Sequence, residues 1–179
     1  DLILLFGPLE AAWAESPDLQ VALTIDGRFE ISGIGDRLTG LSRPEIFAHI
    51  VDRVIRGLIA EDTTGLALHA ALVGNSSGCI LIAGATGAGK SSVAAWFTAK
   101  GFDFWTDELV VVAADSQVPL PLGRALVAKS GSMPLIAQMA PFVGAPYVDM
   151  ALGRAIRPPQ AQSAPSDRIR LVVLPHYQA

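Results

Sequence analysis

The segment GCILIAGATGAGKSSVAAWF, residues 78–97, constrains the fold of this chain more than any other segment. An apolar run at 79–83 leads into a glycine-rich loop, and residues suited to a helix follow from 90 to 100, with Gly101 as a C-terminal stop. The loop fits the pattern G-x-x-x-x-G-K-[ST], whose fixed positions here are Gly84, Gly89, Lys90 and Ser91. The segment therefore predicts a strand, a glycine loop and a helix in succession.

The chemistry of this loop predicts a nucleotide site with ATP and Mg²⁺ as cofactors. Glycines let backbone N–H groups converge on phosphate oxygens, Lys90 reaches the β- and γ-phosphates, and the Ser91 hydroxyl ligates the metal. The N-terminus of the following helix adds its positive dipole. The alternative is an accidental glycine-rich turn between a strand and a helix. The expected nucleotide-binding residues of the loop are Gly84, Ala85, Thr86, Gly87, Ala88, Gly89, Lys90, Ser91 and Ser92.

Two adjacent acids, Asp107 and Glu108, stand within the apolar run FDFWTDELVVVAA at 102–114, which we expect to form one strand. Burying them costs free energy unless they meet a cation or a proton donor. Phosphoryl transfer needs a magnesium ligand and a group that positions or deprotonates the attacking oxygen, and the two acids meet this need. The alternative is a strand end at which both acids face water.

Three further polar residues are candidates for the same site. His69 lies in the apolar run at 66–73, where a histidine is more often a satisfied core residue than a catalytic one. Arg124 and Lys129 are the cations best suited to stabilise charge on a transferred phosphate, and the alternative for each is a surface charge.

The rest of the chain predicts several short elements. Asp26-Gly27 is a preferred dipeptide for a tight hairpin turn, and Ser42 can cap a helix whose apolar residues recur at helical spacing. Ser132 can cap a short helix in the same way. The expected elements are a hairpin over 21–32, a helix over 41–60, strands over 66–73 and 79–83, short strands over 119–131, a helix over 132–140, a loop over 157–167 and a strand over 169–177.

Length and charge limit the classes of protein that fit. The 179 residues suit a single domain, in which we expect 1–65 to form a hairpin and a helix and 66–179 a nucleotide-binding core. Thirteen basic residues, which do not cluster, stand against seventeen acidic ones, so we expect no nucleic-acid partner.

Cys79 is the one cysteine, which fits a cytoplasmic protein. Each apolar run is shorter than the ~20 residues of a spanning helix, so we expect no membrane partner.

Three segments together resemble the C-terminal kinase domain of the HPr serine kinase/phosphorylase family. They are LHAALV at 68–73, GCILIAGATGAGKSSVAAWF at 78–97 and GFDFWTDELVVV at 101–112, and a weaker similarity continues through PLPLGRALVAKSGS. The resemblance implies an α/β fold with a mixed β-sheet around the P-loop and flanking helices, as in phosphoenolpyruvate carboxykinases. It also implies ATP-dependent phosphorylation of a serine hydroxyl in a protein or peptide, and it leaves self-association into a homo-oligomer open.

The resemblance also implies roles for individual residues. Asp107 would act as the general base on the serine hydroxyl, Glu108 would help to hold magnesium, and His69 would lie near the acid and tune it. The chain departs from the family at Ser92, where the family has an acid, at Glu108, where it has Asp, and in lacking an R-G-x-G segment. A small-molecule hydroxyl is therefore an alternative acceptor, and a regulatory nucleotide-binding module or a simple nucleotide hydrolase is an alternative function.

Overall fold

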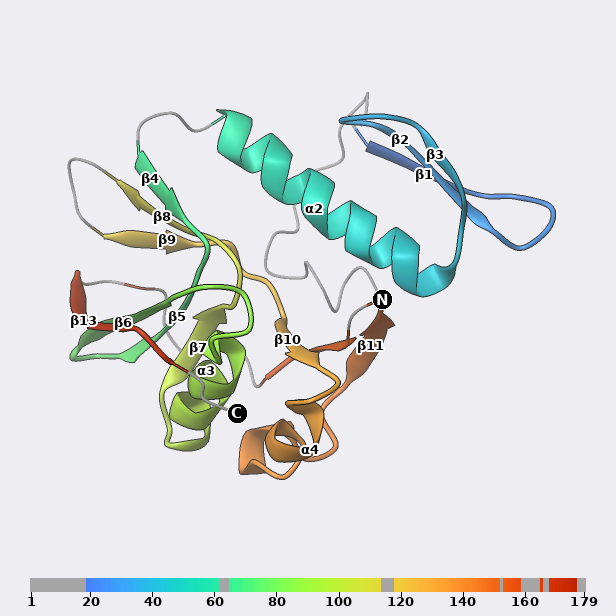
Figure 1. The fold of residues 1–179 in the computed structure, drawn as a ribbon. Helices are drawn as coiled ribbons and strands as arrows, with labels where there is room; N and C mark the ends of the chain where they lie inside the picture. Colours follow the sequence, from blue (N-terminus) through green and yellow to red (C-terminus); the bar gives the residue numbers. More distant parts are fainter. Residues whose placement is uncertain are drawn as a thin grey trace. The chain divides into compact units, whose positions relative to one another are not determined.

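The computed structural model describes residues 19–61, 65–113, 118–151, 153–158, 165 and 168–176. It is a mixed α/β protein with several small sheets and few helices (Figure 1). Its residues fall into two compact units. The N-terminal unit consists of Ala11–Thr63 with Asp149–Leu152, and the core unit contains Thr64–Val148 and Gly153–Ala179. Much of the predicted loop over 157–167 lies outside the described residues.

The N-terminal unit begins with the predicted hairpin. Strands β1 (Leu19–Leu23) and β2 (Phe29–Gly33) pair antiparallel, and β3 (Leu38–Leu41) pairs with β2 on its other side. Gly27 has a φ of 74° in the connecting turn, a conformation that glycine adopts without steric cost. The sequence prediction of a hairpin around Asp26-Gly27 is confirmed.

Helix α2 (Arg43–Glu61) confirms the predicted helix over 41–60. Ser42 precedes it, and the Ser42 backbone N–H and hydroxyl both donate to Oε2 of Glu45, at 2.8 and 2.6 Å. This is the glutamate half of a capping box, which satisfies a backbone donor at the start of the helix. Ile46 and Ile50 are buried, as their helical spacing predicts.

The main sheet of the core unit has the strand order β13-β6-β5-β7. Strand β5 (Ala70–Asn75) pairs antiparallel with both β6 (Gly78–Ala83) and β7 (Asp103–Thr106), and β13 (Ile169–Val173) runs parallel to β6. The sheet is therefore mixed, as expected. An antiparallel neighbour lies beside the strand that enters the glycine loop.

Helix α3 (Lys90–Ala99) follows the glycine loop and packs against β5, β6 and β7. Gly101, at a φ of 90°, lies just beyond its end, and both helix and stop agree with the prediction. The helix face of the sheet is apolar and buried. This cluster contains Ala71, Val73, Ile80, Ile82, Ala94, Ala95, Phe104, Leu126, Ala128, Ile136, Phe142 and Ile156.

Two smaller sheets complete the core unit. One has the order β4-β8-β9, formed by β4 (Gly65–Leu68), β8 (Val110–Ala113) and β9 (Pro119–Pro121). The other has the order β10-β12-β11, in which β10 (Leu126–Lys129) pairs antiparallel with β12 (Gly153–Ile156).

Strand β11 (Tyr147–Met150) is the third strand of the β10-β12-β11 sheet. The short strands predicted over 119–131 and the strand predicted over 169–177 are present as β9, β10 and β13.

Two predicted strands are each broken in the structure. The run 66–73 divides at His69 into β4 and β5, and the run 102–114 divides at 107–109 into β7 and β8. Leu68 is paired with Val110 in one sheet and Leu72 with Thr106 in the other. The two chain segments therefore stay side by side but change sheets, and the residues at the break are free of ladder pairing.

The predicted helix over 132–140 is wrong in length. Helix α4 covers only Met133–Ile136, and a short 3₁₀ helix, η2 (Ala140–Phe142), follows. Pro141 prevents a continuous helix from running beyond 140, because its ring would clash with the carbonyl four residues before it. Ser132 does not cap the helix with its side chain, and its hydroxyl donates to the Lys129 carbonyl instead.

Candidate functional site

The glycine loop between β6 and α3 has the backbone conformation that its sequence requires. Gly87 and Gly89 have φ angles of 85° and 101°, in the left-handed region where a side chain would be strained. Within the loop, Ala88 donates its N–H to the Ala85 carbonyl at 3.1 Å. The loop is exposed at 84–87, so its backbone is open to a ligand.

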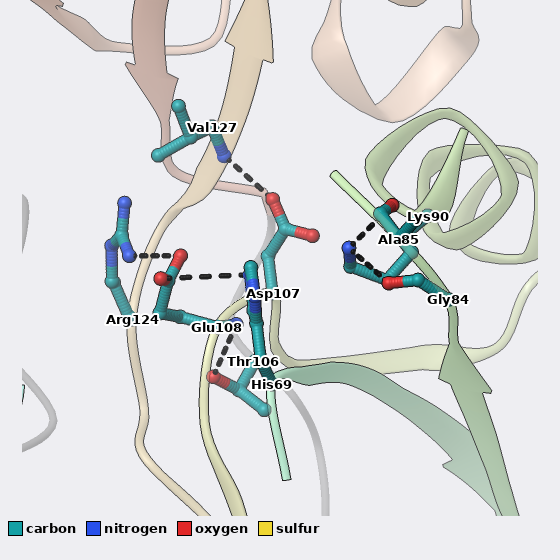
Figure 2. A network of polar contacts seen from close by, with 9 residues as sticks. All are labelled: His69, Gly84, Ala85, Lys90, Thr106, Asp107, Glu108, Arg124 and Val127. Atoms are coloured by element: carbon teal, nitrogen blue, oxygen red, sulfur yellow. Dashed lines mark hydrogen bonds and ion pairs between the residues drawn. The ribbon is translucent and has the colours of Figure 1, made fainter. Parts of the chain in front are cut away.

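Lys90 ties the loop to the first turn of α3. Its ammonium group donates to the carbonyl oxygens of Gly84 and Ala85, at 2.9 and 3.2 Å (Figure 2). The residue is 7% exposed, so a buried cation lies directly beneath the loop. Its two partners are neutral carbonyls, which leaves its positive charge available to an anion.

Asp107 follows β7 and is buried, with 5% of its surface exposed. Its Oδ2 atom accepts the backbone N–H of Val127 in β10 at 2.9 Å (Figure 2). Its Oδ1 atom is buried and has no hydrogen bond of ordinary geometry. One oxygen of this carboxylate is therefore fixed by the fold, and the other is not.

Burial raises the pKa of Asp107 from 3.8 to about 6. The Val127 N–H, the Ser91 hydroxyl and the Arg124 charge each lower this pKa in part, and the Glu108 charge raises it. Ser91 is thus close enough to act on the carboxyl group, although Oδ1 has no hydrogen bond of ordinary geometry. Ser91 links the glycine loop to the acid.

Glu108 lies between two cationic or ionisable groups. Its Oε2 atom is 2.5 Å from Nη1 of Arg124, and its Oε1 atom is 3.6 Å from Nε2 of His69 (Figure 2). The Arg124 side chain is only 5% exposed, whereas those of Glu108 and His69 are 30% and 54% exposed. The three side chains form a row from the interior toward solvent.

The break between the sheets explains why these side chains meet. His69 stands at the gap between β4 and β5, and Asp107 and Glu108 stand at the gap between β7 and β8. Arg124 lies in the connection that enters β10. Regular pleating would send Asp107 and Glu108 to opposite faces of a sheet, and the break removes that constraint.

The predicted site residues divide into those that the structure brings together and those that it does not. The loop group and the acid group meet at Ser91 and Asp107, and His69 and Arg124 join the acid group through Glu108. Lys129 is exposed at the end of β10, and within the described part of the chain its side chain forms no ion pair with the two acids.

Sequence reasoning missed two contributors to the site. The first is the Val127 backbone N–H, for which no sequence signal exists. The second is Thr106, which is fully buried and accepts the Glu108 N–H at 3.4 Å. The sequence feature that could have identified Thr106 is its position directly before the two acids.

Unpartnered buried polar atoms concentrate at this site. Within the described residues, three buried side-chain atoms lack a hydrogen-bond partner, and two of them are Oδ1 of Asp107 and Nε of Arg124. Such atoms are rare in folded proteins, so each calls for an explanation such as an ordered water, an ion or a ligand. Here one is an acceptor and the other a donor.

The donor set suits a magnesium ion that arrives with a nucleotide. In the part of the chain that the structure describes, no group of three or more His, Cys, Asp or Glu side chains is placed to hold a metal. Magnesium bound with phosphates needs only one or two protein oxygens. The Ser91 hydroxyl, at the start of α3, is such an oxygen.

A scan against protein-family models and searches of curated proteins and of solved structures found no match to this chain. Among the described residues, no helix has both the length and the apolar character needed to cross a membrane.

Proposed function

We propose that this chain is an ATP- and Mg²⁺-dependent kinase that transfers the γ-phosphoryl group to a hydroxyl, with a serine of a protein or peptide as the acceptor. The observation that carries the proposal is the buried Asp107 carboxylate. One of its oxygens is fixed by Val127, the other has no hydrogen bond of ordinary geometry, and the carboxylate lies near the serine of a G-x-x-x-x-G-K-[ST] loop.

The bound nucleotide and its magnesium ion supply an electrophilic phosphorus and a charged leaving group. Lys90 stabilises the negative charge of the β- and γ-phosphates, since its ammonium group lies under the loop. The Ser91 hydroxyl would provide an oxygen atom for the metal, which leaves the free oxygen of Asp107 to act as a base.

Asp107 also has the acid–base property that the reaction requires. Its free Oδ1 accepts the proton of the acceptor hydroxyl while that oxygen bonds to the γ-phosphorus and the bond to the β-phosphate oxygen breaks. A carboxyl with a pKa of about 6 is ionised near neutral pH and is a stronger base than an ordinary aspartate. Arg124 lowers this pKa through its charge, and His69 lies on the solvent side.

The resemblance to the HPr serine kinase family supports a serine acceptor. The mixed sheet, with antiparallel β5 beside β6, agrees with the fold that this resemblance implies and counts against a simple nucleotide hydrolase of the parallel-sheet type. A small-molecule hydroxyl remains the alternative acceptor, because Ser92 replaces an acid of the family.

A second candidate function is a regulatory nucleotide-binding module without transfer activity. The observation in its favour is that both oxygens of Glu108 already face Arg124 and His69. This module would bind ATP in the same loop but would not use Asp107 as a base.

An acceptor screen separates these functions. The protein is incubated with MgATP labelled in the γ-phosphate and with serine peptides, proteins and small hydroxyl compounds, and products are read by mass spectrometry. We expect transfer with the wild type and with Asp52→Asn, an exposed acid of α2, but not with Asp107→Asn. ATP binding without transfer to any acceptor, in the wild type and Asp107→Asn alike, would contradict the kinase function and support the regulatory module.

A further inference from the structure

The connection from β9 to β10, together with the start of β10, holds both acids of the site. Leu122 donates its N–H to the Leu109 carbonyl at 2.9 Å, so the connection runs beside the break that follows β7. Arg124 then contacts Glu108, and three residues later Val127 contacts Asp107. One short stretch of chain therefore sets the positions of two consecutive carboxylates.

The two contacts differ in kind. Asp107 is held by a neutral backbone donor, whereas Glu108 is held by the charge of a buried guanidinium group. Arginine stays protonated in proteins, so a guanidinium that is 5% exposed needs a negative partner. Glu108 is the carboxylate at ion-pair distance. If Glu108 turned toward a metal ion, the buried charge of Arg124 would lose its carboxylate partner, which costs free energy.

The other oxygen of Glu108 faces His69. The imidazole Nε2 lies 3.6 Å from Oε1, and the side chain is 54% exposed. Glu108 thus stands between an interior cation and a histidine that borders solvent. A carboxylate in this position fixes the orientation of an imidazole ring, as it does for many catalytic and metal-bound histidines.

We propose that Arg124 is a positioning residue that holds Glu108 against His69, so that Glu108 orients His69 and leaves the magnesium ion to Ser91. The inference rests on the proposed function for the presence of magnesium and for a role of His69. It assigns Glu108 a different task from the metal ligation that the family resemblance implies.

The metal part of the inference is tested by calorimetric titration of ATP at a series of Mg²⁺ concentrations. We expect Ser91→Ala to raise the Mg²⁺ concentration needed for half-maximal tightening of ATP binding by roughly 10- to 100-fold. Glu108→Gln should leave that concentration within about twofold of the wild-type value. An increase in Glu108→Gln as large as that in Ser91→Ala would make Glu108 a metal ligand and overturn the inference.

The positioning part is tested without nucleotide, by the imidazole ¹H–¹⁵N resonances of His69 at one fixed pH. We expect Arg124→Met and Glu108→Gln to move them to the same new position, with no further change in the double variant. Arg124→Lys, which keeps the charge, should restore them at least partly. Backbone amide resonances of α3, in the same unit as the three side chains, report that each variant is folded.

Two outcomes of this second test overturn the inference: His69 resonances that stay at their wild-type position in Arg124→Met, or that move additively in the double variant. If Arg124→Met does not fold, Glu108→Gln and Arg124→Lys decide in the same way. A wild type that binds no ATP would contradict the proposed function and the assignment of magnesium. The His69 resonances would still decide the role of Arg124.

Discussion

Val127 in β10 donates its backbone N–H to Oδ2 of Asp107, the residue that follows β7, at 2.9 Å. Because the donor is a backbone group, the position of the acid depends on where β10 lies and not on the side chain at 127. Strand β10 is held by its pairing with β12. The geometry of the candidate site should therefore respond to changes in β12 that touch none of its residues.

Gly153, at the start of β12, provides such a change. It pairs with Lys129 at a φ of 153°, and a Cβ atom there would overlap the Ala128 carbonyl oxygen and lie 2.9 Å from Cα of Lys129. Gly153→Ala should destabilise the protein by at least about 2 kcal/mol and lower Tm by several degrees in calorimetry. It should also weaken ATP binding.

Gly131→Ala is the matched control. Nothing lies within 4 Å of the Cβ atom that this substitution would add, so we expect Tm to stay close to the wild-type value. Equal Tm values for the two variants would contradict the tight pairing of β10 and β12.

The ionised side chain of Asp107 should destabilise the protein at neutral pH, so the wild type should be less stable there than Asp107→Asn. Burial raises the pKa of Asp107 from 3.8 to about 6, so the folded state binds the proton more tightly than the unfolded chain. The protonated Asp107 side chain stabilises the folded state fully below about pH 4, and this contribution is lost as the pH rises through about 6. Asp107→Asn should therefore be more stable than the wild type at about pH 8, by up to about 3 kcal/mol.

Denaturant unfolding at several pH values measures this effect. The advantage of Asp107→Asn should shrink toward zero at about pH 4, where both side chains are neutral. Asp52→Asn, at an exposed site, should show no such trend. An advantage that does not change with pH would mean that Asp107 has the same pKa in the folded and unfolded states.

Lys90→Ala should weaken ATP binding by roughly 10- to 100-fold, because one charged hydrogen-bonding group to the phosphates is lost. Calorimetric titration of MgATP measures the affinity. Lys100→Ala removes a lysine that lies over the Trp96 ring at the other end of α3, and it should bind ATP as the wild type does. Equal losses of ATP affinity in Lys90→Ala and Lys100→Ala would indicate a general effect of charge rather than a nucleotide site at the glycine loop.

The elements that the sequence predicted well depend on local interactions. The hairpin at Asp26-Gly27, the glycine loop and α3 with its stop at Gly101 are each determined by residues a few positions apart. The antiparallel entry into the loop also followed from a short turn between β5 and β6.

The break in each strand depends on pairing between residues far apart in the sequence, so local sequence patterns could not predict it. The runs containing His69 and Asp107 are apolar on both sides, so periodicity indicates one continuous strand in each case. The exchange of partners between two sheets interrupts both runs at the same place. The ion pair of Arg124 with Glu108 spans sixteen positions and depends on this exchange.

If the kinase proposal holds, phosphoryl transfer should increase with pH through an apparent pKa of about 6, because Asp107 accepts a proton only when ionised. The negative charge of Glu108 raises the pKa of Asp107 and the positive charge of Arg124 lowers it. Glu108→Gln should therefore move the midpoint of kcat/KM to lower pH, and Arg124→Met should move it to higher pH.

Initial rates of transfer at saturating MgATP, measured across the pH range at low acceptor concentration, give this midpoint for the enzyme before the acceptor binds. Asp52→Asn is the control, since its exposed carboxylate belongs to the N-terminal unit and should leave the midpoint unchanged. Shifts of the same sign in Glu108→Gln and Arg124→Met would contradict an electrostatic origin. Opposite shifts around a midpoint near 6 would identify Asp107 as the group whose ionisation limits transfer.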